Sequence, residues 1–441
     1  MSYSLHGAAS CQRRSRSGPR HRGPGRTVPR LADNGRVNDV SFPHLGPLLG
    51  DEGQALLAAL RDYDPAKELA VATRLRREHP AELVSAALGQ ARLRQRAVAK
   101  FGEEDAYRMY FTPNGIEQAT RASVAAYRAG RFRDIGPVEV TDLCCGIGGD
   151  AIALAREGFF VQAVDRDPLT AETALVNVHT VVEGTPLMTV TCADVMEYDL
   201  SGSESLFIDP ARRAGRGRIF DPEAYSPPLS WAIEKVREVG TGAIKIAPGI
   251  PHELIPEDFE AEWISDGGDV KEAVLWRDDQ GPTSPSPVVP GARRATLLPS
   301  GATLTGRGLP DPQVRKVGRF LYEPDGAVIR AHLVAEVAAD LDGGLIDATI
   351  AYITADELRP TPYATAYEIT DELPFNLKKL KALLREREVG ILTVKKRGSA
   401  VEPEELRRKV KPSGPNAATV FLTRVAGAPT MLIGGPAGTA D

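Results

Sequence analysis

The sequence lacks the features that would assign it to several common protein classes. Four cysteines in 441 residues are too few for a disulfide framework, and their spacing with the seven histidines matches no zinc pattern, so we expect neither disulfide nor metal. No stretch reaches the roughly 18 uncharged apolar residues of a membrane span, and no apolar secretory signal begins the chain, so we expect a cytoplasmic protein. The net charge of -5 does not indicate a nucleic-acid binder, and such a partner must be argued from local charge.

The N-terminal 40 residues are rich in arginine and almost free of apolar periodicity. Eight arginines lie between positions 13 and 36, among glycine, proline and serine. This composition cannot bury enough apolar surface to fold, so we predict a disordered basic arm over residues 1–40. The arm either attracts RNA or is an unstructured start of the chain.

A helical region is predicted over residues 45–130. Between Asp51 and Lys100 the apolar side chains recur at helical spacing, and Pro65 and Pro80 fall where helices begin. A second helical stretch covers residues 115–131. The region also holds a run of cations that forms either a solvated face or a phosphate-binding one: Arg92, Arg94, Arg96 and Lys100.

Strand and helix patterns alternate between residues 131 and 280. This alternation predicts an α/β fold with a parallel, doubly wound, Rossmann-like sheet. The turn Asp266-Gly267-Gly268-Asp269 indicates a closing antiparallel hairpin. The expected strands are 138–143, 160–164, 188–192, 205–209, 242–247, 262–265 and 271–277, and the expected helices are 149–157, 168–179 and 228–238.

A stretch rich in proline and serine follows the hairpin. Residues 281–291 have the composition of a linker, and beyond them we predict a separate α+β domain over 292–441. Its expected strands are 347–354, 364–370, 390–396, 417–425 and 429–433, and its expected helices are 327–340, 375–388 and 402–410.

A glycine-rich loop lies between a predicted strand and a predicted helix. Gly146, Gly148 and Gly149 provide a tight turn, room for a ligand at the backbone and free N–H groups at a helix start, all of which a nucleotide-type ligand needs. These glycines alone do not distinguish a methyl donor from a dinucleotide. However, Asp142 lies four residues before the first glycine, and the spacing is G-x-G-G rather than G-x-G-x-x-G.

The loop resembles motif I of class I S-adenosylmethionine-dependent methyltransferases. Asp165, 23 residues after Asp142, ends the next strand, where a carboxylate can accept both ribose hydroxyls. Asp194 resembles the acid that this family places against the adenine amine, although each acid alone could equally cap a helix. Together they imply S-adenosylmethionine as the cofactor, with these binding residues: Asp142, Cys144, Gly146, Gly148, Gly149, Asp165 and Asp194.

The fourth strand ends in Asp209-Pro210-Ala211-Arg212. It resembles the D/N/S-P-P-aromatic tetrad that holds an exocyclic base amine in related methyltransferases, but it lacks the second proline and the aromatic residue. It is also similar to the uridine C5-methyltransferases, yet no cysteine nucleophile occurs after Cys192. We therefore predict direct transfer to N or O, with Asp209 and Pro210 catalytic and Arg212 binding substrate. Alternatively, Asp209 only caps a turn.

Tyr110-Phe111-Thr112-Pro113-Asn114 precedes the first strand of the sheet. It resembles the F/S-x-T-P-E segment that covers cofactor and substrate in the trimethylguanosine synthase group of RNA methyltransferases. The resemblance implies that Phe111 and Thr112 contact the substrate. A helix cap at Thr112 explains the pattern almost as well.

The C-terminal region carries a local excess of positive charge. Residues 376–411 contain twelve cations and five carboxylates, a net charge of +7, which suits phosphate contacts but is also typical of a solubilising surface. The order of elements resembles the THUMP-like domain of a group of bacterial methyltransferases. The resemblance implies a methyltransferase that acts on an N or O atom of structured RNA, such as tRNA or rRNA. The alternatives are a small-molecule methyltransferase, or an RNA-binding protein with a degenerate cofactor domain.

Overall fold

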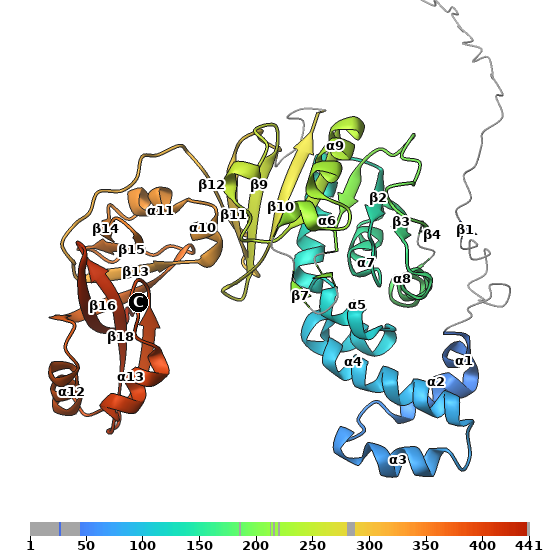
Figure 1. The fold of residues 1–441 in the computed structure, drawn as a ribbon, viewed down its shortest axis with the longest axis horizontal. Helices are drawn as coiled ribbons and strands as arrows, with labels where there is room; N and C mark the ends of the chain where they lie inside the picture. Colours follow the sequence, from blue (N-terminus) through green and yellow to red (C-terminus); the bar gives the residue numbers. More distant parts are fainter. Residues whose placement is uncertain are drawn as a thin grey trace, which may run out of the picture.

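The computed structural model describes residues 26–27, 45–184, 187–211, 213–214, 217–218, 221–279 and 287–438. The C-terminal α+β domain lies beside the large sheet along the longest axis, and the N-terminal helical region lies below the sheet (Figure 1). The predicted basic arm lies outside the described residues except for β1 (Arg26–Thr27), which pairs with β4 (Met188–Cys192). No described helix is both long and apolar enough to cross a membrane.

The residues before the sheet form helices, as predicted. The long helix α4 contains Gly102 at a φ of +75°, a left-handed conformation that kinks the helix and that glycine adopts without steric cost. Apolar side chains from α2, α4 and α6 contribute to one core that continues into the sheet domain. The helices are α1 (Gly46–Leu49), α2 (Asp51–Ala59), α3 (Glu68–Leu75), α4 (Ala81–Arg108), α5 (Pro113–Gln118) and α6 (Ala122–Ile135).

The run of cations on α4 is only partly exposed, and two of its four members are held by backbone carbonyls. Arg92 and Arg96 are exposed, as a solvated face requires. Arg94 is only 6% exposed, and its Nε donates to the carbonyl of Met109 at 2.9 Å. The Nζ of Lys100 donates to the carbonyls of Ile116 and Ala119, both at 2.8 Å, so it caps the C-terminal end of α5. Arg94 and Lys100 therefore bind carbonyl groups of the backbone that follows α4.

The large sheet has the predicted doubly wound order. Its strands lie in the order β1-β4-β3-β2-β5-β8-β10-β9-β11-β12. The five neighbouring strands β4, β3, β2, β5 and β8 run parallel to one another. The winding reverses between β2 and β5, and ligands bind at such a switch point. The elements are β2 (Glu139–Leu143), α7 (Gly149–Arg156), β3 (Phe160–Asp165), α8 (Pro168–Val181), β5 (Leu206–Ile208), α9 (Leu229–Val239), β8 (Thr241–Ile246), β9 (Glu260–Asp266) and β10 (Asp269–Asp278).

The predicted boundary between linker and C-terminal domain was wrong. β11 (Arg293–Leu298) pairs in parallel with β9, and β12 (Ala302–Thr305) pairs with β11, so the large sheet extends to Thr305. The buried side chains of Ala295 and Leu297 join the same core as β9. Residues 281–286 lie outside the described residues, and their composition is that of a linker. However, the strand that follows them pairs with the large sheet, so this linker does not mark a domain boundary.

A second, seven-stranded sheet forms the C-terminal domain, in the order β14-β15-β13-β16-β19-β18-β17. The single predicted helix over 327–340 is two helices separated at His332, which has a φ of +59°. The single predicted strand over 347–354 is a hairpin, and β13 was not predicted. The elements are β13 (Phe320–Pro324), α10 (Gly326–Arg330), α11 (Val334–Asp340), β14 (Gly344–Asp347), β15 (Ile350–Ala355), β16 (Ala364–Pro374), α12 (Leu377–Glu386), β17 (Val389–Lys396), α13 (Pro403–Val410), β18 (Asn416–Val425) and β19 (Ala428–Pro436).

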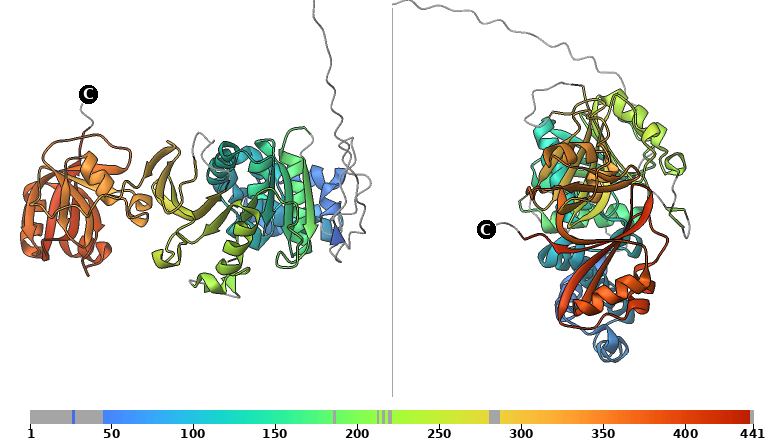
Figure 2. Two further views of the ribbon diagram at one scale, coloured as in Figure 1. Left: turned by 90° about the horizontal axis from the view of Figure 1, so that it is seen from above. Right: turned by 90° about the vertical axis from the view of Figure 1, so that its left-hand side faces the viewer.

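One apolar core joins the two sheets. Ile244 and Trp263 of the large sheet belong to the same buried cluster as Val328 and Val337 of α10 and α11. The basic helices α12 and α13 cover the other end of the C-terminal domain through Leu380 and the residues packed around it. Figure 2 shows this domain at the opposite end of the molecule from the N-terminal helices. The two sheets are therefore parts of one packed unit.

Candidate active site

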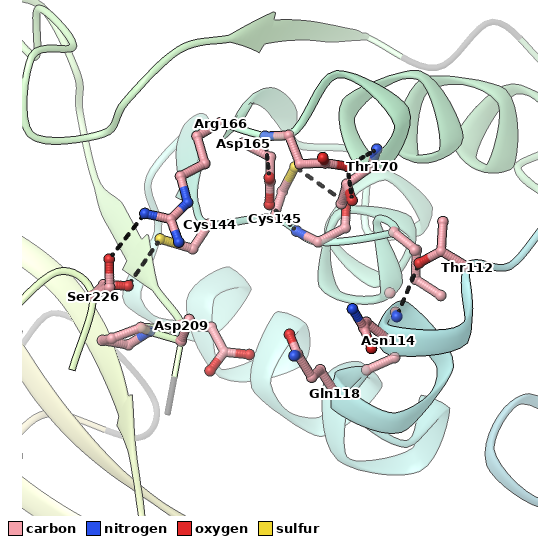
Figure 3. A pocket seen from close by; sticks show the side chains of 18 of the residues that line it. Thr112, Asn114, Gln118, Cys144, Cys145, Asp165, Arg166, Thr170, Asp209 and Ser226 are labelled. Carbon is pink, nitrogen blue, oxygen red and sulfur yellow. Dashed lines mark hydrogen bonds between the residues drawn. The ribbon is translucent and has the colours of Figure 1, made fainter. Parts of the chain in front are cut away.

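A cavity of about 660 Å³ lies at the carboxyl ends of β2, β3, β4 and β5. Helix α5 and the residues after it form the facing wall, as Figure 3 shows. This volume is in the range of cofactor sites. The predicted site residues that line it are Thr112, Cys144, Gly146, Gly149, Asp165, Asp194, Asp209 and Pro210.

The glycine loop has the conformation that its sequence predicts. Gly146 and Gly148 have φ values of +56° and +84°. A Cβ on Gly146 would meet no atom within 4 Å, so this backbone faces open space in the cavity wall. A Cβ on Gly148 would lie 3.2 Å from the Cα of Ala174, so this glycine lets α8 approach the loop and does not itself line the cavity. Gly146 is therefore the position where a ligand can approach the backbone.

Asp165 is fixed in the cavity wall by two backbone donors. The amides of Gly146 and Asp167 donate to its two carboxylate oxygens, each at 3.0 Å. Burial raises the pKa of Asp165 above its ordinary value, and these two hydrogen bonds oppose that rise. Asp194 is more exposed and accepts from the amide of Met196 at 2.9 Å. Both acids thus shape a turn and also face the cavity.

Asp142 does not lie in the cavity wall, contrary to prediction. It is fully buried in β2, and in the described part of the chain neither carboxylate oxygen has a hydrogen-bond partner. Burial and the nearby carboxylates of Asp150 and Asp209 raise the pKa of Asp142 well above its ordinary value. The strand pattern gave its position in the chain but not the direction of its side chain.

Asp209 lies at the end of β5 and faces the cavity. Its Oδ2 accepts from the Nζ of Lys245 at 2.7 Å. Among the hydrogen bonds of the described residues, none runs from a turn amide to its side chain, so the prediction that it only caps a turn lacks support. Pro210 follows it in the wall, and Ala211 closes the wall by exchanging backbone hydrogen bonds of 2.9 and 3.1 Å with Ser226. Arg212 lies outside the described residues.

Of the two residues predicted ahead of the sheet, only Thr112 lines the cavity. Its Oγ1 accepts from the amide of Gly115 at 2.9 Å and so caps α5, which is the alternative the sequence left open. Phe111 is 2% exposed and packs on Phe101 with ring centroids 5.6 Å apart. The prediction that Phe111 contacts substrate was wrong, because this apolar ring is in the core behind α5.

Helix α5 forms a polar wall of the cavity that was not predicted from the sequence. Asn114 and Gln118, four residues apart on this helix, both point into the cavity in Figure 3. Their spacing after Thr112-Pro113 is the signal that could have identified them. Arg166 was also missed, and it is the one cation among the described lining residues, against six carboxylates. A lining of this charge favours a ligand that carries positive charge.

The comparisons with known proteins agree with this geometry. A THUMP domain-like family matches residues 364–436, and a domain of unknown function, DUF8688, matches residues 43–97. An uncharacterized S-adenosylmethionine-dependent methyltransferase of Mycobacterium tuberculosis, found in strains CDC 1551 and H37Rv, is 32% identical over 343 residues, which cover 76% of this chain and 90% of that protein.

A crystal structure from Porphyromonas gingivalis W83, provisionally named a methyltransferase, has the same fold. Its TM-score is 0.72 at 20% identity, over 90% of this chain and 100% of that one. The backbone facing open space at Gly146 and the carboxylates around the cavity suit a cofactor that carries a ribose and a sulfonium. The chain belongs to the class I S-adenosylmethionine-dependent methyltransferases that carry a C-terminal THUMP-like domain.

Proposed function

We propose that this enzyme methylates a nitrogen or oxygen atom of a nucleotide in structured RNA. The observation that carries the proposal is the carboxylate of Asp209, which follows β5 on the other side of β2 and faces the same cavity as Asp165 and Asp194. The alternative of a degenerate cofactor domain is not favoured, because the loop, the cavity and two of the three predicted acids are in place.

The cavity residues divide into a cofactor end and a target end. The carboxylate of Asp165 has lone pairs left, which we assign to the ribose hydroxyls, and we assign the exposed carboxylate of Asp194 to the adenine amine. S-adenosylmethionine supplies an activated methyl group, so the protein contributes mainly alignment and exclusion of water. At the target end, an oxygen of Asp209 accepts a hydrogen from the target amine or hydroxyl and so directs its lone pair toward the methyl group.

Two cysteines line the cavity, but neither is suited to covalent attack on a base. Burial raises the pKa of Cys144 and Cys145 well above the ordinary value for a thiol, and nearby carboxylates raise them further. The thiolate is the nucleophilic form of cysteine. Direct transfer to N or O is therefore preferred to transfer to the C5 atom of uridine.

The basic C-terminal segment is less positive than its sequence suggests. Half of its twelve cations form ion pairs, some with carboxylates far away in the sequence such as Glu323 and Asp371. Exposed cations without such a pair in the described part of the chain remain on α12 and at the end of α13, and we propose that they bind RNA phosphates. The paired cations are Arg387, Lys395, Lys396, Arg397, Arg407 and Lys409, and the unpaired ones are Lys378, Lys379, Lys381, Arg385, Arg408 and Lys411.

Removing charge from α12 tests the proposed RNA-binding surface. In a variant with Lys378→Ala and Lys381→Ala, we expect RNA affinity to fall and the slope of log affinity against log salt to decrease by roughly 0.7 to 0.9 for each phosphate that the variant no longer neutralises. Arg74→Ala with Arg77→Ala on and after α3 removes the same charge from another exposed helical surface and should leave the slope unchanged. Equal effects of both pairs on filter-binding titrations would argue against a specific basic surface.

A small-molecule substrate is the second candidate. It is favoured by the six carboxylates of the cavity lining, which repel phosphate. For RNA, this charge requires the phosphates to stay at the rim, near the exposed Arg166, whose Nη1 donates to Ser226 at 3.4 Å. Truncation before the C-terminal domain cannot separate the candidates, because one core joins both sheets.

Mass spectrometry of RNA nucleosides separates the two candidates. RNA from a strain that lacks the protein should be missing one methylated nucleoside that complementation restores. Unchanged nucleosides together with the disappearance of a methylated metabolite would favour the small-molecule substrate.

A further inference from the structure

A buried lysine lies directly behind the target end of the cavity. Lys245 is 4% exposed on β8, a strand whose other residues are apolar or small. Its Nζ donates to Oδ2 of Asp209 at 2.7 Å and to Oγ1 of Thr120 at 2.8 Å. Burying an ammonium group is costly unless it is paired, so a lysine here requires these partners.

Lys245 belongs to a cluster that holds more acids than bases. Arg128 pairs with Asp150 and Glu272, and Thr120 also donates to Asp150 at 3.0 Å. Burial raises the pKa of Glu272 overall and the ammonium of Lys245 opposes that rise, whereas the pKa of Asp150 is lowered overall by Arg128 and Lys245. Within the described residues, Lys245 is the only cation that forms an ion pair with Asp209. Without it, Asp209 would lose this ion pair, and the nearby cation of the cluster would be Arg128, which is already paired with Asp150 and Glu272.

The two partners of Lys245 come from opposite walls of the cavity. Asp209 follows β5, and Thr120 follows α5. Lys245 itself does not line the cavity, so it acts from behind both walls. Its bond engages only Oδ2 of Asp209, and no hydrogen bond among the described residues engages Oδ1. That oxygen is therefore available as the acceptor for a target group.

We propose that Lys245 is a positioning residue for methyl transfer, which fixes the Asp209 carboxylate so that Oδ1 accepts a hydrogen from the target atom. The inference rests on the proposed role of Asp209. In this account β8, which does not line the cavity at Lys245, sets the geometry of the target end. A misplacement of about 1 Å at a reacting centre lowers the rate by about 100-fold.

The test compares Lys245→Met, Lys245→Arg and the control Lys235→Met, a half-buried lysine on α9 that pairs with Glu238 of the same helix. For Lys245→Met we expect kcat for RNA to fall about 100-fold, with the Kd for S-adenosylmethionine changed less than about threefold, because the lysine acts at the target end. Lys245→Arg keeps a cation and should recover about tenfold of that loss. The control should match the wild type. A parallel loss of cofactor affinity in Lys245→Met would assign the lysine to structure and overturn the proposal.

A double-mutant cycle with Asp209→Asn separates this inference from the proposed function. If Lys245 acts through Asp209, Lys245→Met should lower kcat by less than about threefold in the Asp209→Asn background, because coupled residues are not additive. An undiminished loss of about 100-fold in that background would overturn the proposal while leaving Asp209 in its role. Full activity of Asp209→Ala alone, which removes both side-chain oxygens, would instead contradict the role of Asp209 on which the proposed function rests. If Lys245→Met does not fold, Lys245→Arg completes the cycle: its expected loss of about tenfold should shrink to less than about threefold in the Asp209→Asn background, and an undiminished loss there would overturn the proposal.

Discussion

Asp209→Ala is expected to lower methyl transfer by about 10²- to 10³-fold while changing the Kd for S-adenosylmethionine less than about threefold. The size follows from losing one preorganised hydrogen-bond partner in a site that works mainly by alignment. Cofactor affinity is preserved because the contacts proposed for the ribose and adenine come from β3 and β4. Single-turnover rates with labelled cofactor give the first quantity and calorimetry gives the second.

Asp269→Ala is the matched control for this variant. Asp269 is an exposed aspartate at the start of β10 in the same sheet, so its loss should leave both quantities near wild type. An Asp209→Ala enzyme that transfers methyl groups at the wild-type rate would remove Asp209 from the mechanism. A variant that loses cofactor affinity by the same factor as rate would place Asp209 in the cofactor site instead.

Asp142→Asn is expected to stabilise the protein at neutral pH. Asp142 is fully buried without a hydrogen-bond partner among the described residues, and burial raises its pKa well above the ordinary value. The folded state therefore keeps a proton that the unfolded state releases, so wild-type stability falls as pH rises from about 4 toward the folded pKa, by about 1.4 kcal/mol per pH unit. Asparagine has nearly the same shape and no proton to release, which removes this loss.

Thermal melts between pH 4.5 and 8 measure the effect. The difference in Tm between Asp142→Asn and wild type should widen with rising pH and reach at least a few degrees at neutral pH. Asp150→Asn is the control with opposite sign: burial alone would raise the pKa of Asp150, but Arg128 and Lys245 lower it overall. Breaking that buried pair costs about 3 to 5 kcal/mol. A Tm difference for Asp142→Asn that stays constant across pH would show that Asp142 holds no proton.

The cofactor half of the site could be predicted from the sequence because it depends on local rules. Gly146 lies between a strand and a helix, Gly149 begins that helix, and Asp165 and Asp194 lie at or just after strand ends, so parallel pairing brings them to one edge. The prediction that Phe111 contacts substrate was wrong because it depended on long-range packing. Whether a side chain next to the site faces the cavity or the core depends on packing against distant residues, here Phe101 on α4.

Other features depend on partners that are distant in the chain. β11 joins the large sheet because the edge of β9 accepts it, which no local composition indicates. The net charge of residues 376–411 overstates the positive charge that is available to a partner, because cations such as Lys395 pair with distant carboxylates such as Glu323. The position of Lys245 could have been noted in the sequence, because a lysine inside an otherwise apolar strand needs a buried acid. Only the fold identifies that acid as Asp209.

Transfer of labelled methyl groups from S-adenosylmethionine by the purified protein tests the central claim most directly. Three separate reactions each contain the enzyme, the labelled cofactor and one substrate fraction: total RNA, RNA-free protein or a small-molecule extract. The Asp209→Ala variant is tested beside the wild type in each reaction. Label should enter RNA with the wild type and be reduced about 10²- to 10³-fold with the variant. Label that enters only the small-molecule or protein fraction, with none in RNA, would contradict the proposal that this methyltransferase acts on RNA.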